Sequence, residues 1–265
     1  MRTYLFIDGG YLRTNYVNSV RAWFGCDGQI DFRLLKKRFP DSVQRCFYYD
    51  ALEDEPREGE AREEFEQRIE QDEKFFHEID ELDGYFVRLG SVTGKRNRRR
   101  QKKVDILLAV EALDHAARRN MDQAILLTGD RDFEPLVTSL VQLGVRVEVA
   151  GDKQTTSRYL RRAADAYRSL SFDDYYKWTV DAVREKSPLL VRSLNAGNLR
   201  ASSVFEIGIF QGKKVELRKV NGADVYYLQI DKFPDARSHL TLEFNDVQRL
   251  KLYFELQYGE IVWKN

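Results

Sequence analysis

The segment from Asp122 to Gly151 constrains the fold of this chain most, because it reads as strand, acidic turn, helix and strand. Residues 124–127 (Ala-Ile-Leu-Leu) are apolar on both faces, which is typical of a parallel strand lying between two helical layers. Residues 134–143 repeat apolar side chains at helical spacing, with Pro135 in the first turn. This pattern predicts an α/β fold.

Carboxylates follow two of the predicted strands. Asp130 and Asp132 come directly after the strand at 124–127, and Asp8 follows a strand at residues 2–7. Open parallel sheets bind their ligands at the carboxyl ends of the strands. Asp8 could simply cap the helix that follows it, but its position at the end of a second central strand favours a functional site.

Asp105 adds a fourth candidate acid, in the first turn of a helix predicted at residues 104–118, where the helix dipole alone also favours an acid. The alternation of strands and helices predicts a mostly parallel sheet in which Asp8, Asp130 and Asp132 converge at one edge. Asp105 can reach that edge from its helix. Carboxylates so close together repel one another, and one or two Mg²⁺ or Mn²⁺ ions, which prefer oxygen ligands, would remove that repulsion.

Such an ion can lower the pKa of a bound water and hold both oxygens of a phosphodiester displacement. A metal-dependent nuclease is therefore consistent with these residues, and a phosphatase uses similar parts. Against a haloacid-type phosphatase, Gly10 stands where that class needs a second Asp after Asp8. A dinucleotide-binding fold is disfavoured because no G-x-G-x-x-G motif follows the first strand.

The most basic run of the chain immediately precedes Asp105. Seven of its nine residues are cationic: Lys95, Arg96, Arg98, Arg99, Arg100, Lys102 and Lys103. A solvated loop is one interpretation, and a nuclear import signal is another. A nucleic-acid clamp is favoured, because cationic side chains neutralise phosphates and release their counterions.

Composition narrows the class of protein. The chain has 43 basic and 43 acidic residues, so net charge indicates no partner and only local clustering can. Cys26 and Cys46 form no metal or disulfide pattern, which fits a reducing cytosol, and we expect a cytoplasmic protein. No apolar run approaches the length of a membrane helix, so no membrane partner is expected.

Periodicity predicts the remaining elements of the first domain. Helices are expected at residues 31–38, 61–82, 153–170 and 172–187, and strands at 42–51 and 85–89. Asp50, at the end of one of these strands, could lie near the site, but a turn role is favoured.

The pattern changes after residue 200. Short strands at 204–210, 214–220, 225–230, 239–242 and 261–263, with a helix at 245–256, predict a small α+β, β-rich module. We expect three parts: a first domain at 1–172, a bridging helix and linker at 173–200, and an accessory domain at 201–265.

Three ordered motifs resemble the NYN domain, a member of the PIN-like nuclease superfamily, and are closest to its bacterial LabA-like branch. They are residues 6–12 (Phe-Ile-Asp-Gly-Gly-Tyr-Leu), 101–111 and 122–133. The resemblance covers about residues 1–170. It implies a PIN-like three-layer α/β/α fold and metal-dependent cleavage of RNA.

The resemblance also implies roles for particular residues. Asp8, Asp105, Asp130 and Asp132 match the metal-binding acids of the family, and Thr128 matches the small hydroxyl residue before its Gly-Asp. Two further positions depart from the family pattern in ways that leave a supporting role open. Glu111 stands where an Asp is usual, and Tyr11 stands where many relatives carry Asn.

The resulting expectation is a ribonuclease that binds single-stranded RNA, RNA being favoured over DNA. The C-terminal module would select the substrate, a protein partner or a second copy of the chain. The alternative is a non-catalytic nucleic-acid-binding regulator that keeps the fold and its acids.

Overall fold

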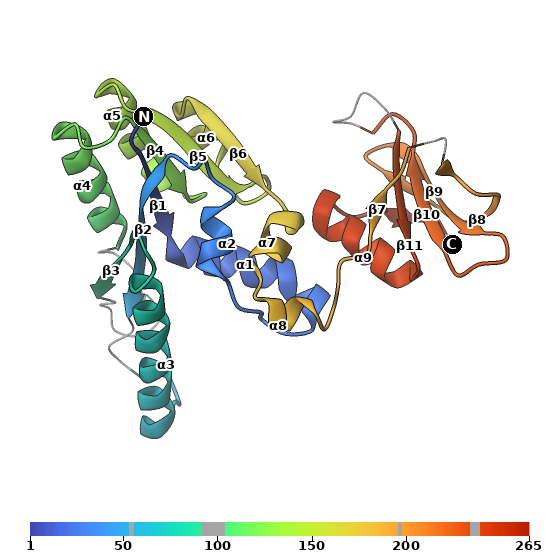
Figure 1. Cartoon of the computed structure of the whole chain (residues 1–265), viewed down its shortest axis with the longest axis horizontal. Coiled ribbons are helices and arrows are strands. Elements are labelled where there is room, and N and C mark those ends of the chain that lie inside the picture. Colours follow the sequence, from blue (N-terminus) through green and yellow to red (C-terminus); the bar gives the residue numbers. More distant parts are fainter. Residues whose placement is uncertain (53–55, 92–103, 196–197, 234–238, 265) are drawn as a thin grey trace. The chain divides into compact units, whose positions relative to one another are not determined.

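The computed structural model describes residues 1–52, 56–91, 104–195, 198–233 and 239–264. The chain forms two compact units (Figure 1). The first consists of residues 1–18 and 29–178, and the second of residues 19–28 and 179–265. The expected domain boundaries at residues 172 and 200 remain a prediction about independently folding parts.

The first unit contains a parallel sheet, as the sequence pattern predicted. Within the described residues it has six strands in the order β3-β2-β1-β4-β5-β6, every neighbouring pair parallel. The strands are β1 (Thr3–Asp8), β2 (Val43–Leu52), β3 (Tyr85–Ser91), β4 (Gln123–Leu127), β5 (Arg146–Asp152) and β6 (Ala166–Leu170). β1 and β4 are fully apolar in their centres because helices cover both faces of the sheet.

Helices form a layer on each face, so the fold is a three-layer α/β/α sandwich (Figure 1). On one face, α4 (Val104–Ala117) and α5 (Glu134–Gln142) pack Leu108, Val137 and other apolar residues against Phe6 and Leu126. On the other face, Tyr48 contacts Phe32 of α2 (Phe32–Lys36) and the aromatic residues of α3 (Arg62–Asp80). α1 (Gly9–Phe24) and α7 (Phe172–Trp178) complete the helices of this face, and α6 (Arg158–Ala163) follows β5.

The prediction of a single helix at residues 153–170 is wrong. The chain forms only the short α6 there and then turns into β6, which extends the sheet beside β5. Asp165 starts this pairing, since its backbone N–H donates to the Val147 carbonyl oxygen and its carboxylate accepts from the Val147 N–H. Hydrogen bonding to β5 therefore outweighs the helical periodicity of the segment. The helix expected at 172–187 is likewise divided into α7 and α8 (Asp181–Arg184).

The second unit is a β-rich module, as predicted. Within the described residues it has an antiparallel sheet of six strands in the order β12-β8-β9-β10-β11-β7. They are β7 (Arg192–Ser193), β8 (Ser202–Phe210), β9 (Lys213–Val220), β10 (Tyr226–Ile230), β11 (Leu240–Phe244) and β12 (Val262–Trp263). α9 (Val247–Tyr258) packs on the sheet, with Phe254 against Phe210. β7 lies in the segment that was expected to be a linker.

Across these described ranges, no helix has the length and apolar character needed to cross a membrane.

Candidate active site

The centre of the parallel sheet brings two of the predicted acids together. β1 and β4 are neighbours, and the chain extends outward from this pair in opposite directions, which is the point where open α/β sheets form a ligand crevice (Figure 1). Asp8 is the last residue of β1. Asp130 follows β4 after Thr128 and Gly129, so both acids lie at the carboxyl edge of adjacent strands.

Thr128 links these two acids. Its side chain is buried, its Oγ1 donates to Asp8 Oδ2 at 2.9 Å, and the same oxygen accepts from the Asp130 N–H at 3.3 Å. Asp130 in turn caps the short 3₁₀ helix η1 (Arg131–Phe133), because its Oδ1 accepts from the Asp132 N–H at 3.0 Å. The Thr-Gly-Asp turn therefore fixes the β4 acids relative to Asp8 through the backbone and one hydroxyl.

Asp8 combines a capping role with a position in the acidic cluster. Its Oδ1 accepts from the Tyr11 N–H at 3.0 Å in the first turn of α1. Burial raises the pKa of Asp8, the hydrogen bonds from Tyr11 and Thr128 oppose this rise, and the charges of Asp50 and Asp130 add to it. The helix-cap interpretation and the site interpretation of Asp8 are thus compatible.

Asp105 interacts electrostatically with the other three acids. It is the second residue of α4 and is partly buried. Its pKa is raised to about 6, chiefly by burial and in addition by the charges of Asp8, Asp130 and Asp132. Acids from three distant segments of the chain therefore share one negative field at the carboxyl edge of β1 and β4.

The donor chemistry of this cluster suits a hard divalent cation. Carboxylate oxygens are the preferred ligands of Mg²⁺ and Mn²⁺. As placed, no three His, Cys, Asp or Glu side chains of the described residues lie close enough together to hold an ion jointly. Unneutralised carboxylates repel one another, so binding of an ion would require these side chains to turn towards it.

Glu111 and Tyr11, the two predicted supporting residues, have different surroundings. The Glu111 carboxylate accepts hydrogen bonds from Tyr49 Oη at 2.8 Å and from the Arg88 guanidinium at 3.1 Å. It therefore anchors α4 to β2 and β3. This contact accounts for a carboxylate at position 111 on structural grounds.

Tyr11 joins the site to the β5–α6 loop. Its Oη accepts from the Asp152 N–H at 2.9 Å and shares hydrogen bonds with the hydroxyls of Thr155 and Thr156. Its ring lies against Gly129, where a Cβ atom would come within 2.5 Å of Tyr11 Cε2. Glycine is therefore required beside Asp130, and Tyr11 fills the space that this glycine leaves.

Asp50 is a fifth acid near the cluster, and its assignment to a turn is wrong. It lies inside β2 and is fully buried, with Arg13 Nη2 at 2.7 Å and Tyr48 Oη at 2.8 Å from its carboxylate oxygens. Its Oδ2 would be 2.5 Å from a Cβ on Gly9, so it lies directly against the backbone that follows Asp8. A carboxylate directly after the buried run Cys46-Phe47-Tyr48-Tyr49 was the signal that could have identified it.

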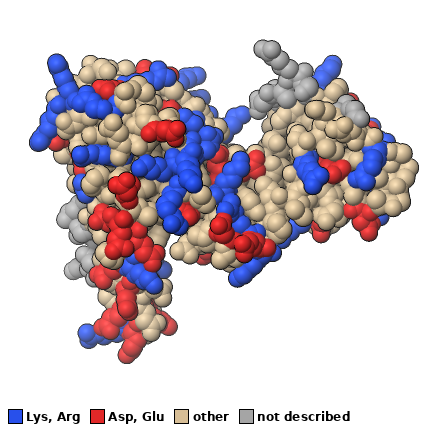
Figure 2. Space-filling view, viewed as in Figure 1, with Lys and Arg blue, Asp and Glu red and all other residues tan. Residues whose placement is uncertain are grey.

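The predicted basic clamp, Lys95, Arg96, Arg98, Arg99, Arg100, Lys102 and Lys103, lies outside the described residues and remains a prediction. Acidic side chains gather instead along α3 on the face seen in Figure 2. Most of these acidic side chains lie on the solvent-exposed face of α3, so we interpret them as solvated charges.

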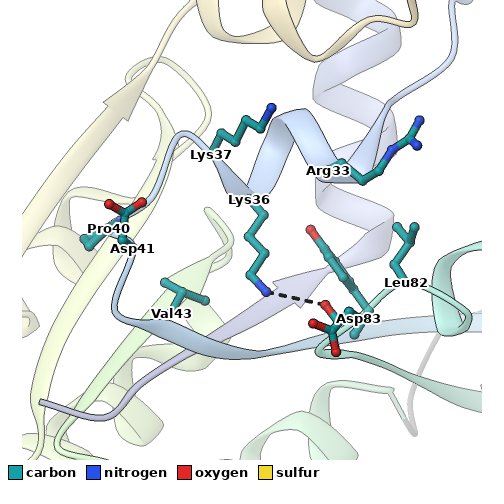
Figure 3. Close-up of a pocket in the computed structure, with 9 residues that line it drawn as sticks. Arg33, Lys36, Lys37, Pro40, Asp41, Val43, Leu82 and Asp83 are labelled. Atoms are coloured by element: carbon teal, nitrogen blue, oxygen red, sulfur yellow. Dashed lines mark hydrogen bonds between the residues drawn. The ribbon is translucent and has the colours of Figure 1, made fainter.

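A pocket of about 450 Å³ lies away from the acidic cluster (Figure 3). Its walls include Lys36, Val43 and Tyr85, the last two at the amino-terminal starts of β2 and β3. The Lys36 ammonium donates to the Asp83 carbonyl oxygen at 3.4 Å. Because the acids lie at the opposite ends of the parallel strands, this pocket is separate from them.

Comparison with known proteins identifies one family. The sequence model of the NYN domain matches residues 2–171. Among solved structures, the chain is similar to a protein of unknown function from Vibrio parahaemolyticus, with 20% identity and a TM-score of 0.48 over 65% of this chain and 93% of that one. No curated protein sequence matches the chain.

Proposed function

The chain belongs to the NYN domain family, part of the PIN-like nuclease superfamily, and from this premise we propose that it is a metal-dependent ribonuclease. The superfamily suggests nuclease activity. We assign the cation-binding and catalytic role to Asp8, Asp105, Asp130 and Asp132. Single-stranded RNA is the proposed substrate, and Mg²⁺ or Mn²⁺ the proposed ion.

One observation carries the proposal. Asp8 at the end of β1 and Asp130 after β4 lie at the same edge of the sheet and are joined through Thr128. Burial raises the pKa of Asp105 on α4, and the charges of Asp8, Asp130 and Asp132 add to that rise. An arrangement that concentrates unneutralised acids is unfavourable for folding by itself, so it is expected where a cation compensates for it.

In this proposal the residues around the ion have separate roles. When bound, the divalent ion supplies a Lewis acid that polarises the phosphodiester and lowers the pKa of a water molecule. Thr128 keeps one Asp8 oxygen oriented, and the Asp132 N–H does the same for Asp130. The buried Asp50, paired with the half-exposed Arg13, supports the backbone at Gly9, next to Asp8.

The direct test is cleavage of a labelled single-stranded RNA by purified protein with Mn²⁺. Asp130→Asn should abolish cleavage, because the amide cannot supply a negative oxygen to the ion. Asp114→Asn is the matched control, since Asp114 lies on α4 but is exposed and pairs with Arg118. Cleavage that persists unchanged in Asp130→Asn would refute the assignment.

The alternative function is a nucleic-acid-binding regulator without turnover. It predicts that the protein binds RNA but leaves it intact at any Mn²⁺ concentration.

We further propose that the C-terminal unit selects the RNA or a protein partner, a second copy of the chain included, and that the protein is cytoplasmic. Its place in the LabA-like branch, proposed from the three motifs, can be tested with a phylogeny of NYN sequences.

A further inference from the structure

Two arginines and a tyrosine form an exposed stack beside the acidic cluster. The Arg131 guanidinium carbon lies 4.3 Å from the centre of the Tyr159 ring, and the Arg158 guanidinium carbon lies 4.8 Å from the same centre. Arg131 separates Asp130 from Asp132 in the chain. All three side chains of the stack belong to exposed residues.

The stack is tied to the loop that contains the acids. η1, which begins with Arg131, packs against α6, which begins with Arg158. The Ser157 N–H, at the start of α6, donates to the Gly129 carbonyl oxygen at 3.0 Å. Through these contacts two cations from separate segments are held next to Asp130 and Asp132.

Stacking leaves the guanidinium edges free to bind an anion. A guanidinium uses its flat face against an aromatic ring, while its N–H donors point outward in its own plane. Arg158 Nη2 donates to Tyr159 Oη at 2.8 Å. Arg131 Nε forms an exposed ion pair with Glu134 Oε2 at 3.7 Å, a separation too long for a hydrogen bond. Most of the donors of both side chains are thus available for the bidentate geometry that phosphate oxygens favour.

We propose that Arg131, Tyr159 and Arg158 form a phosphate clamp that binds the RNA backbone next to the bond to be cleaved. The inference rests on the proposed function for its substrate. Arg131 and Arg158 contact phosphates, and Tyr159 is a positioning residue that holds both guanidiniums in place. The clamp compensates locally for the repulsion between the acidic cluster and the polyanionic strand.

Binding of a short fluorescein-labelled single-stranded RNA, measured by anisotropy in EDTA over a range of salt concentrations, tests this clamp without cleavage. Arg131→Gln and Arg158→Gln should each weaken binding and reduce the salt slope by about 0.7, the value for one single-strand phosphate contact. Arg118→Gln is the matched control. This exposed arginine follows the carboxyl-terminal end of α4 and pairs with Asp114 in the last turns of that helix. It should leave both the affinity and the slope unchanged.

Tyr159 is tested by variants that separate positioning from charge. Tyr159→Leu should weaken binding roughly 3- to 10-fold with an unchanged melting temperature, and Tyr159→Phe, which keeps the ring, should bind almost normally. Arg131→Lys keeps the charge but loses the stack, so it should restore only part of the affinity lost in Arg131→Gln. The effects of Arg131→Gln and Tyr159→Leu should be non-additive in the double variant.

The outcomes of these experiments test the clamp and the proposed ribonuclease function separately. If the parent protein binds RNA and the clamp variants bind equally well, the clamp is overturned while the proposed function stands. If binding depends on the clamp but RNA is never cleaved with Mn²⁺, the clamp is supported and the nuclease proposal fails. If the parent does not bind RNA at low salt, both are overturned.

Discussion

At the scale of single residues, the ionisation of Asp105 links the acidic cluster to the stability of the fold. Its pKa is raised from the ordinary 3.8 to about 6, so the folded state holds its proton more tightly than the unfolded chain does. Stability without a cation therefore falls as the pH rises from about 4 through about 6, and the full penalty is present above that range. Because Asp105 is only partly buried, we discount this penalty to about 1 kcal/mol.

Asp105→Asn should consequently raise the melting temperature in EDTA at neutral pH by roughly 2–4 °C, because the amide carries no charge to be desolvated or repelled. The gain should vanish at pH values near 4, where Asp105 is protonated. Mn²⁺ should stabilise the parent more than the variant. Thermal melts at both pH values check this, with Asp114→Asn as the control, and an equal gain in that control would contradict it.

Thr128 is the residue that couples Asp8 to Asp130. Thr128→Val keeps the volume but removes the hydroxyl, and Thr128→Ser keeps the hydroxyl. We expect Thr128→Val to reduce the rate of RNA cleavage roughly 10- to 100-fold, as is usual when a group orienting a metal ligand is lost. Thr128→Ser should stay within a few-fold of the parent. Equal rates for the parent and Thr128→Val in a Mn²⁺ titration would show that Asp8 needs no such partner.

At the scale of elements, the loops after β1, β4 and β5 are joined by Tyr11. Its hydroxyl accepts a hydrogen bond from the Asp152 N–H and shares hydrogen bonds with the hydroxyls of Thr155 and Thr156. Asn15, one turn further along α1, accepts from Thr155 Oγ1 at 2.9 Å and strengthens the same connection. These bonds, rather than any single strand, determine how the β5–α6 loop lies beside Gly129.

Tyr11→Phe should therefore destabilise the protein by about 1–2 kcal/mol, since it leaves the Asp152 N–H without its acceptor. Faster amide hydrogen exchange should be confined to residues 152–156. Tyr159→Phe is a matched control that removes an exposed hydroxyl and should not change exchange in that loop. Unchanged protection at Asp152 in Tyr11→Phe would argue against the connection.

At the scale of the whole molecule, α1 contributes to both compact units. Its residues 9–18 belong to the first unit and its last turns to the second. Within the second unit, Trp23 is buried, its indole N–H donates to the Ser187 carbonyl oxygen, and the Arg249 guanidinium lies over its ring. The first unit is consequently not a contiguous segment of the chain.

A truncation to residues 1–178 should then expose Trp23 and Val20 and lose roughly 3 kcal/mol of stability or aggregate. Replacing both residues by Gln in the truncated chain should recover solubility. Gel filtration and thermal melts of the three forms test this. A monomeric 1–178 fragment as stable as the full chain would show that the end of α1 needs no cover from the second unit.

Sequence patterns anticipated much of this structure where the physical signal is local. The apolar run at residues 124–127 and the helical spacing at 134–143, with Pro135 in its first turn, each predicted the correct element, since burial and helix-start preferences are determined over a few residues. β6 was missed because its stability depends on hydrogen bonds to β5. The turn role given to Asp50 was wrong because its partner Arg13 lies 37 residues away along the chain.

By itself, the sequence determined the alternating α/β architecture, the NYN motifs and the identity of the candidate acids, since hydrophobic periodicity and short motifs are properties of neighbouring residues. Only the tertiary structure decided that β6 extends the sheet beside β5, that Thr128 bridges Asp8 and Asp130, and that Arg131 lies over the Tyr159 ring. These contacts join residues far apart in the chain, and the strand order and loop packing that create them follow from the energy of the whole fold rather than from any local stretch.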